Sequence, residues 1–576
     1  MRKLIAVLKF GSSVLRSEDD LPRVADEIYR WVRVGHRVVA VVSALGNTTD
    51  ELFARARSYG QCAGHAIAEL VATGEATSAS LLRLALDRAG IPCVTLNAQR
   101  IGLETSGPVL DASPQRLDTA AVLTALVDCP VAIVPGYVGY GEDGRTSLLG
   151  RGGSDLTALF IAHQVNADLC RLIKDVDGFY ESDPAESITR PLRYRTIHWD
   201  EARGLGADVV QPKAIQFARV YHLAFEVAAL NSCEATLVGP QPASFYSPEP
   251  STSPLKIGLL GLGTVGAGVY QILTSYPELF EITDVAVRDV ARPERAQLQR
   301  LLTTDPWEAV NGEAEVVIEL IGGEEPARAL IEAALRQGKH VVTANKLVLA
   351  KHGTELLRIA EESGATLRYS AAVGGAVPML EFVQRLSNTD SLQSIRGVLN
   401  GTCNFVLDEL AAGSSFSAAV ASAQACGFAE ADPTLDLDGS DTAQKLVLLA
   451  RQAFGADIEF DQIDRDGILN LDAEQILRLA SSGKAVRLIA ELTDAPPGLH
   501  AIVHPEVVDA DHPFAHIRAE QNCLICETVD GREFVLRGKG AGRWPTTVAV
   551  TADLMELVRE LSGKEEKFVV ASGSVA

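Results

Sequence analysis

The chain has 576 residues, of which 47% are hydrophobic and 22% are charged, and its formal net charge is −23. Its length predicts three or four domains, and its composition is typical of globular protein. The negative charge argues against a general nucleic-acid surface, and no apolar run reaches the roughly 18 residues of a membrane span, so we expect neither nucleic-acid nor membrane partners.

Nine cysteines in a chain of this length are too sparse for a disulfide scaffold. Cys523 and Cys526 form the single C-x-x-C pair, and no second pair or nearby histidine completes a zinc site. Because the pair lies in a strand-like run, we expect two core cysteines. This cysteine usage predicts a cytoplasmic protein.

Apolar strands alternate with helical stretches through residues 1–240. The candidate strands are Leu4–Lys9, Arg37–Ser43, Cys93–Asn97, Val131–Pro135 and Leu169–Lys174. This alternation predicts a mostly parallel sheet covered by helices on both faces. Ligands gather at the strand ends of such sheets.

Four of these strand ends carry unusual loops: Lys9–Ser13, Ser43–Asp50, Gly150–Asp155 and Lys174–Pro184. The first has a glycine and two hydroxyls whose backbone N–H groups could face phosphate, and the third precedes a helix expected over Thr157–Val165. Each loop alone is more often a plain turn than a ligand site. The four in this order are more specific.

Together with Ala72-Thr-Gly-Glu75, these segments resemble the catalytic domain of aspartate kinase, in the amino acid kinase fold, over about residues 3–240. The resemblance implies an αβα sandwich that binds ATP with Mg2+. It implies that Lys9 neutralises charge on the transferred phosphoryl group and that Asp155 orients this lysine. The implied substrate-binding residues are Glu75 for the ammonium, and Arg151 and Thr49 for the α-carboxylate. The implied ATP-binding residues are Lys9, Gly11, Ser12, Ser13, Lys174, Asp175 and Tyr180.

This half departs from the family pattern at four positions. Ser12 replaces a glycine, Lys174 stands where a threonine is usual, Ala185 where an arginine often lies, and Asp208 where a lysine commonly touches ATP. Lys174 could compensate for the lysine missing at 208. Two interpretations therefore stay open, an active aspartate kinase and a catalytically inactive nucleotide-binding or assembly module.

Residues 239–254 contain five prolines and four serines. This composition predicts a semi-rigid linker with polyproline character, which we place at 241–254.

A glycine-rich turn follows the strand expected at Leu255–Gly261. Gly261-Leu-Gly263-Thr264-Val265-Gly266 then opens a helix, and a second strand is expected at Ile282–Val287. A lone G-x-G-x-x-G is weak evidence, but its strand–turn–helix context is that of a dinucleotide site. Arg288, with Arg292 nearby, favours the 2′-phosphate of NADP, while Asp289 leaves NAD open. Further strands at Val316–Ile321 and His340–Thr343 continue a Rossmann domain.

An acidic segment lies about 165 residues further on. It holds five carboxylates in twelve positions: Glu430, Asp432, Asp436, Asp438 and Asp441. Pro433 and Gly439 predict a loop here, followed by a helix over Lys445–Phe454 that Ser440 or Asp441 can cap. Asp441 and Lys445 lie four residues apart and share a helix face. The alternative is a solvated loop with one ion pair, but carboxylates suit a substrate ammonium and a lysine suits a developing alkoxide.

The glycine turn, Thr343-Ala-Asn-Lys346, Asn400-Gly-Thr402 and the acidic segment resemble homoserine dehydrogenase over residues 255–562. The resemblance implies a Rossmann domain (255–375, completed by 536–562), an α+β catalytic and dimerisation domain (376–535) and a homodimer. It implies reduction of aspartate semialdehyde with NADP or NAD, with Lys445 as proton donor. Further implied site residues are Lys346 beside the reacting centre, Glu430, Asp436 and Asp441 around the substrate, and Gly540 and Gly542 against the cofactor.

The resemblance also bears on metal and regulation. The family often holds a monovalent cation on backbone carbonyls that match Val373, Gly375 and Val377 together with a glutamate, and Ser370 takes the glutamate's place, so we expect any Na+ on carbonyls alone. The short linker leaves no room for ACT regulatory modules. The leading hypothesis is a bifunctional enzyme with aspartate kinase and homoserine dehydrogenase activities, and the alternative is a homoserine dehydrogenase fused to an inactive kinase-like module.

Overall fold

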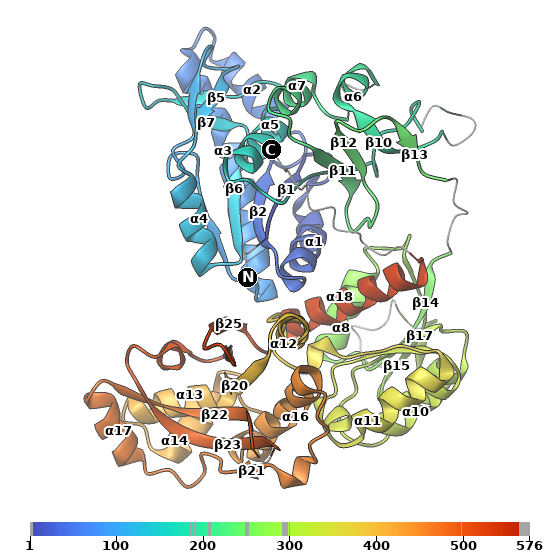
Figure 1. The fold of residues 1–576 in the computed structure, drawn as a ribbon, viewed down its shortest axis with the longest axis vertical. Coiled ribbons are helices and arrows are strands. Elements are labelled where there is room, and N and C mark those ends of the chain that lie inside the picture. Colours follow the sequence, from blue (N-terminus) through green and yellow to red (C-terminus); the bar gives the residue numbers. More distant parts are fainter. Residues whose placement is uncertain are drawn as a thin grey trace. The chain divides into compact units, whose positions relative to one another are not determined.

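The computed structural model describes residues 4–184, 187, 191–205, 209–247, 253–290, 298, 300–496 and 498–563. Ala185, Asp208 and Arg292, named above, lie outside these residues. The chain divides into two compact units, formed mainly by Met1–Thr252 and by Ser253–Val558, and each is described by itself (Figure 1). No helix in the described ranges is both long and apolar enough to cross a membrane.

The first unit is built on a sheet whose described strands follow the order β13-β10-β12-β11-β9-β1-β2-β6-β3. These strands are β1 (Ile5–Phe10), β2 (Arg37–Val42), β3 (Cys93–Thr95), β6 (Val131–Pro135), β9 (Leu169–Lys174), β10 (Tyr194–His198), β11 (Phe225–Ala229), β12 (Thr236–Gly239) and β13 (Ser244–Phe245). The neighbours from β11 to β3 run parallel, whereas β11–β12 and β10–β13 are antiparallel. All five expected strands are confirmed, with ends that shift by no more than two residues.

Helices cover both faces of this sheet, since β1 and β2 are buried at every position after the first. The helices are α1 (Leu21–Arg33), α2 (Thr48–Ser58), α3 (Gly64–Ala89), α4 (Thr119–Asp128), α5 (Gly153–Gln164), α6 (Trp199–Leu205) and α7 (Pro212–Val220). A smaller sheet of β4 (Glu104–Ser106), β5 (Ser113–Arg116), β7 (Val138–Tyr140) and β8 (Thr146–Leu148) packs beside α3. The layered α/β architecture is the one that the sequence predicts.

Two boundaries in this unit differ from expectation. α5 begins at Gly153, four residues before the helix expected at Thr157, so Asp155 lies in its first turn. β13 falls inside the expected linker, because Tyr246 N donates to Arg193 O at 2.9 Å and the Thr196 and Ser244 hydroxyls lie 2.7 Å apart. Pairing with β10 therefore draws the start of the proline-rich segment into the sheet.

The second unit opens with a Rossmann-like parallel sheet in the order β16-β15-β14-β17-β18-β19. The strands of this sheet are β14 (Leu255–Leu260), β15 (Phe280–Ala286), β16 (Leu302–Thr303), β17 (Val316–Glu319), β18 (His340–Thr343) and β19 (Leu367–Arg368). The helices that pack on it are α8 (Thr264–Leu273), α9 (Pro306–Asn311), α10 (Ala327–Arg336), α11 (Lys346–Ser363) and α18 (Arg543–Leu561). Leu259 and Ile318 pack into the core with α8 and α18, whereas Leu260 and Val317 pack with α9 and α10. The alternation of side chains along each strand therefore fills both layers.

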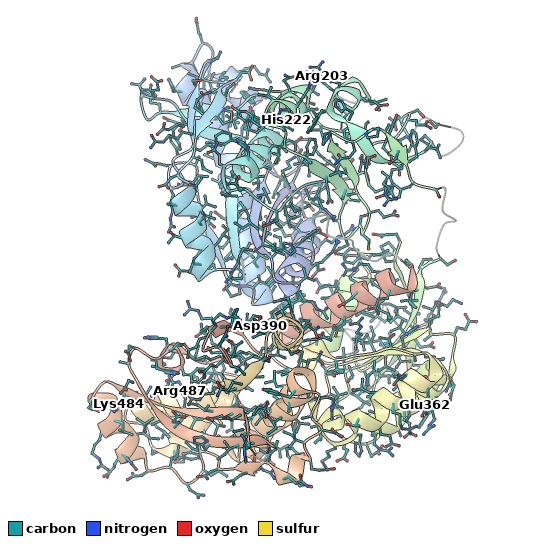
Figure 2. All side chains as sticks on the ribbon, in the orientation of Figure 1. Arg203, His222, Glu362, Asp390, Lys484 and Arg487 are labelled. Carbon is teal, nitrogen blue, oxygen red and sulfur yellow. The ribbon has the colours of Figure 1, made fainter. Side chains whose placement is uncertain are left out.

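A mixed sheet in the order β21-β23-β22-β20-β24-β25 forms the rest of this unit. The strands of this sheet are β20 (Leu392–Val398), β21 (Asp464–Arg465), β22 (Lys484–Ala495), β23 (Gly498–Asp509), β24 (Gln521–Thr528) and β25 (Glu533–Lys539). The helices of this part of the unit are α12 (Met379–Thr389), α13 (Gly401–Ala411), α14 (Phe416–Ala425), α15 (Thr434–Leu437), α16 (Ser440–Phe454) and α17 (Ala473–Ser481). Cys523 and Cys526 are buried in β24, as expected. Arg487 (Figure 2) is buried in β22 and pairs with Asp408 of α13 at 2.9 Å, which links this helix to the sheet.

Candidate active sites

The acidic segment of the second unit contains a helical turn that the sequence reasoning missed. Pro433 is the N-cap of α15, and Gly439, with φ +84°, separates α15 from α16. Proline is tolerated at a helix start because its missing N–H would have no intrahelical partner. α16 begins at Ser440, so Ser440 and Asp441 lie inside the helix and do not cap it. Asp438 Oδ1 instead accepts a hydrogen bond from Ser440 N at 2.8 Å.

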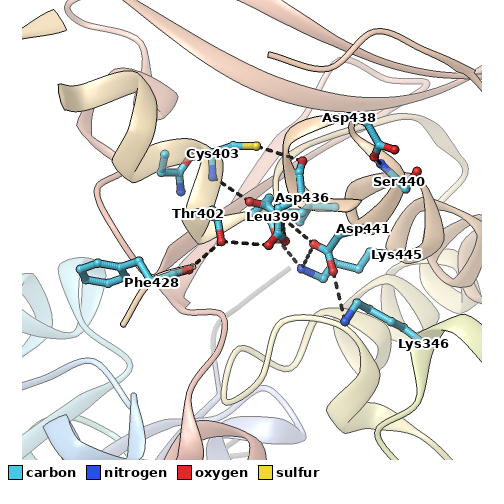
Figure 3. A network of polar contacts seen from close by, with 12 residues as sticks. Lys346, Leu399, Thr402, Cys403, Phe428, Asp436, Asp438, Ser440, Asp441 and Lys445 are labelled. Carbon is cyan, nitrogen blue, oxygen red and sulfur yellow. Dashed lines mark hydrogen bonds and ion pairs between the residues drawn. The ribbon is translucent and has the colours of Figure 1, made fainter. Parts of the chain in front are cut away.

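One buried carboxylate joins the two lysines that the sequence singled out. Asp441 Oδ2 lies 2.7 Å from Lys445 Nζ, and Asp441 Oδ1 lies 3.1 Å from Lys346 Nζ (Figure 3). Lys445 also donates to the Leu399 carbonyl at 2.6 Å. Asp441 and Lys445 are only 7% and 8% exposed. The expected ion pair is therefore part of a lysine–carboxylate–lysine cluster in which Asp441 and Lys445 are buried and Lys346 is partly exposed.

The electrostatics of this cluster favour its charged form. Burial alone would raise the pKa of Asp441, but Lys445 and Lys346 hold it well below its usual range. Asp441 in turn raises the pKa of Lys346 against the effect of burial. At neutral pH Asp441 is thus an anion and Lys346 a cation.

Asp436 lies next to this cluster through Asn400. The Asn400 amide donates to Asp436 Oδ1 at 2.7 Å and to Asp441 Oδ2 at 2.8 Å, and the Thr402 hydroxyl lies 3.2 Å from Asp436 Oδ2. Burial and the charge of Asp441 raise the pKa of Asp436. Glu430 is exposed and adds to the field that raises the pKa of Lys346. Neither Asn400 nor Thr402 was assigned a role from sequence, although both belong to the Asn-Gly-Thr motif.

The cluster borders the carboxyl edge of the Rossmann sheet. Lys346 is the first residue of α11, directly after β18, and the glycine turn follows β14. β14, β17 and β18 are consecutive parallel neighbours, so their carboxyl ends share one edge. The contacts from Lys346 through Asp441 to Lys445 therefore tie α16 to the edge where dinucleotides bind in this fold.

The glycine turn has the geometry that a bound pyrophosphate requires. Gly261 has φ +102°, and a Cβ at Gly266 would lie 2.0 Å from Gly261 O, so the turn tolerates only glycine at these positions. Gly263 is the N-cap of α8, which Thr264 and Val265 begin. Apart from Gly263 and its two chain neighbours, no described residue has an atom within 4 Å of a Cβ built at Gly263. Space is thus open beside Gly263 at the start of α8, and a helix start is where backbone N–H groups bind an anion.

Three further parts of the predicted cofactor and cation site lie at loops. Arg288 is exposed just beyond β15, beside Asp289. A Cβ at Gly375 would lie 3.1 Å from the carbonyl carbon of Gly540, which places the turn of Gly540 and Gly542 beside the Val373–Val377 segment. Next to this segment, Ser370 Oγ donates to Asp553 of α18 at 2.7 Å, so a buried carboxylate stands near the serine that replaces the family's glutamate. The cation stays a prediction.

The first unit contains a cavity of about 1110 Å3. It is lined by every kinase-site residue predicted from the sequence: Lys9, Gly11, Ser12, Ser13, Thr49, Glu75, Arg151, Asp155, Lys174, Asp175 and Tyr180. Residues from the ends of β1 and β9 and from α2, α3 and α5 thus converge, as the predicted topology requires.

Two lysines share one buried carboxylate here as well. Lys9 Nζ lies 2.6 Å from Asp155 Oδ1, and Lys174 Nζ lies 2.9 Å from Asp155 Oδ2. Burial, together with the nearby charge of Lys174, lowers the pKa of Lys9 to about 8 despite Asp155. Burial would raise the pKa of Asp155, but the two lysines lower it to about 2. A Cβ at Gly11 would lie 2.8 Å from Lys9 Nζ, which explains why glycine follows the strand here.

Glu75 contributes a buried carboxyl group to the same cavity. It is 2% exposed, its Oε1 lies 3.5 Å from the Thr49 hydroxyl, and its Oε2 has no hydrogen-bond partner among the described residues. Burial raises its pKa to about 7. A buried carboxyl with a free oxygen in a cavity suits a cationic ligand group.

Comparisons with known proteins agree with this division. Residues 378–555 match the family model for homoserine dehydrogenase, residues 261–370 that for the homoserine dehydrogenase NAD binding domain, and residues 5–224 that for the amino acid kinase family. The homoserine dehydrogenase of Synechocystis sp. is 35% identical over 326 residues, covering 54% of this chain and 75% of that protein. The homoserine dehydrogenase of Corynebacterium glutamicum is 35% identical over 322 residues, covering 53% of this chain and 72% of that protein.

A solved structure is similar over the same part of the chain. The homoserine dehydrogenase of Thiobacillus denitrificans is 34% identical in sequence to the present chain, and the two superpose with a TM-score of 0.52. The match covers 54% of the present chain and 74% of the Thiobacillus denitrificans chain. These relatives match only about half of this chain.

Proposed function

This chain belongs to the homoserine dehydrogenase family, with an amino acid kinase family domain at its N-terminus, and we propose that it reduces L-aspartate 4-semialdehyde to L-homoserine with NADPH or NADH. The lysine–carboxylate–lysine cluster at the Rossmann edge is the observation that carries the assignment of residue roles.

Lys445 is the proton donor in this proposal. The nicotinamide, when bound, supplies the hydride, and negative charge develops on the substrate oxygen. The Lys445 ammonium meets this oxygen, stabilises the charge and gives up a proton. Asp441 stays ionised and fixes the lysine, while Lys346 adds a second cation. The carboxylates of Asp436 and Glu430 bind the substrate ammonium in this proposal.

The variant Lys445→Ala tests this role. We expect turnover of the semialdehyde to fall about a hundredfold or more, the usual effect of a lost acid catalyst, with little change in the Kd for NADPH measured by fluorescence. Lys346→Ala is measured in parallel. If Lys445→Ala keeps most of its turnover and Lys346→Ala does not, the proton donor is Lys346.

For the N-terminal domain we propose aspartate kinase activity, the transfer of phosphate from ATP to the β-carboxylate of L-aspartate. The convergence of Lys9, Asp155, Glu75 and Arg151 on one cavity supports it. Lys9 and Lys174 would offset charge on the phosphoryl group, Glu75 would hold the ammonium and Arg151, with Thr49, the α-carboxylate. A carboxylate nucleophile needs no general base.

An alternative function for this domain, a non-catalytic nucleotide-binding module, is favoured by Ser12 in place of glycine. A hydroxamate trap for acyl phosphate, run with ATP, Mg2+ and aspartate, separates the two proposals, with Lys9→Met as the matched control. Signal from the wild type but not from Lys9→Met supports the kinase. Absence of a hydroxamate signal from folded protein refutes the kinase proposal, and calorimetry with ATP then tests whether the domain is a nucleotide-binding module. The homodimer, the cytoplasmic location, Na+ and the preference for NADP stay predictions.

A further inference from the structure

Asn400 connects elements of the dehydrogenase site that are far apart in the sequence. It stands between β20 and α13 and is 3% exposed. As the N-cap of α13, it accepts a hydrogen bond on Oδ1 from Cys403 N at 2.8 Å. This bond fixes the side chain, because a capping residue has few free rotamers.

The other end of the Asn400 amide faces two carboxylates. Nδ2 donates to Asp436 Oδ1 at 2.7 Å and to Asp441 Oδ2 at 2.8 Å, which uses both of its hydrogens. A backbone N–H can pair only with the amide oxygen, and carboxylates pair only with the NH2 group, so the network permits one orientation of the amide. The side chain is therefore satisfied at all three of its contacts.

This arrangement has two physical consequences. Asp441 is buried and Asp436 is half-buried, so their charges repel each other, and a neutral donor between them stabilises both ionised forms without consuming their charge. It also holds Asp441 in the position where it pairs with both Lys445 and Lys346. The residue before Asn400 contributes too, because Leu399 O accepts from Lys445.

We propose that Asn400 is a positioning residue of the dehydrogenase, whose amide clamps Asp436 and Asp441 so that Lys445 is aligned and the substrate ammonium meets charged carboxylates. This inference rests on the roles proposed above for Lys445 and Asp436. Asn400 itself acts through its neighbours and not on the reacting atoms.

Loss of the clamp shifts the pH dependence in a defined direction. The titratable and charged groups around the clamp are Asp436 on α15, Asp438 after it, Asp441 and Lys445 on α16, Lys346 on α11, Cys403 on α13 and Glu430 in the preceding loop. The Asn400 hydrogen bond lowers the pKa of Asp436 against burial and the charge of Asp441, so removing the amide raises this pKa further. The acid limb of the kcat/KM profile then moves to higher pH.

Two variants separate this role from helix capping. Asn400→Ser and Asn400→Asp both keep a good N-cap side chain, but neither can donate to both carboxylates. Serine has a single hydrogen on a shorter side chain, and the ionised aspartate has no donor and adds a third anion. We expect kcat to fall about 10- to 100-fold in Asn400→Ser, the size of a lost hydrogen bond to a charged group, with the Kd for NADPH within about twofold of the wild type. The acid limb should lie at higher pH in Asn400→Ser than in the wild type, and higher still in Asn400→Asp.

The control is Asn404→Ser, one turn further along α13, where the buried amide donates to Ala519 O and Gln521 O. It should lower the melting temperature without moving the acid limb. Wild-type kcat and an unmoved acid limb in either folded Asn400 variant would overturn the proposal, as would an equal movement in Asn404→Ser. Lys445→Ala is assayed alongside: if it stays active, the underlying site assignment fails, whereas an inactive Lys445→Ala with a normal Asn400→Ser rejects the clamp alone.

Discussion

Glu75→Gln should stabilise the N-terminal unit at alkaline pH while removing the carboxylate that we propose binds an ammonium group. Burial raises the pKa of Glu75 from its ordinary 4.5 to about 7. At about 1.4 kcal/mol per pKa unit, the ionised carboxylate costs the folded state about 3 kcal/mol relative to the unfolded chain. Because the folded pKa is the higher one, the neutral form contributes stability below pH 4.5, and this contribution is lost as the pH rises through 7.

Glutamine is neutral at every pH, so the variant escapes this loss. We expect the two proteins to have similar free energies of unfolding at pH 5 and to differ by up to about 3 kcal/mol in favour of Glu75→Gln at pH 8.5. Hydrogen exchange of peptides from α3 at increasing urea reports this unit within the full chain. Aspartate-dependent ATP turnover, where the wild type shows it, should be lost.

The control for this experiment is Glu69→Gln, an exposed position on the same helix. It should leave the pH dependence of α3 exchange unchanged. If wild type and Glu75→Gln lose stability in parallel between pH 5 and pH 8.5, the buried carboxyl does not carry the cost assigned to it, and its suitability for a cationic ligand loses its basis.

Three further predictions concern the dehydrogenase. Asp441→Asn removes the anion between two lysines, and because breaking a buried pair costs about 3–5 kcal/mol, chemical denaturation should show a loss of this order together with a drop in kcat. Gly266→Ala should destabilise the fold and weaken NADPH binding, whereas Gly263→Ala, whose Cβ meets open space, should keep its melting temperature and still bind NADPH more weakly. Arg288→Ala should raise the KM for NADPH at least about tenfold and leave that for NADH nearly unchanged; an equal effect on both would refute the 2′-phosphate role.

The sequence patterns predicted those structural features that depend on residues close together in the chain. Continuous apolar runs predicted the buried parallel strands of the first sheet and of the Rossmann sheet, and the four-residue spacing of Asp441 and Lys445 predicted their ion pair. The Asn400 clamp could not be found in this way, because its partners lie 36 and 41 residues away and no periodicity connects them. β13 was missed for a similar reason, since its pairing with β10 overrides a composition typical of linkers.

The turn at α15 was missed because proline and glycine were both taken to exclude helix. Proline blocks a helix interior but not its first position, and glycine at φ +84° ends one helix and starts the next. The five residues between them are enough for the single turn of α15, which has four residues. That turn contains Asp436, to which we assign a role in binding the substrate ammonium.

The two sites use the same ionic arrangement with opposite electrostatic outcomes, and this difference predicts how alkaline pH acts on each. In both, one buried carboxylate lies between two lysines, so the carboxylate and its two lysines together carry one net positive charge. The pKa of Lys9 is lowered to about 8, chiefly by burial, whereas that of Lys346 is raised, chiefly by Asp441. Lys9 therefore loses its proton as the pH rises through 8, while Lys346 keeps its own. ATP affinity measured by calorimetry should fall between pH 7 and pH 9 in the wild type and change much less in Lys9→Met; equal pH dependence in both proteins would show that Lys9 is not the group that titrates.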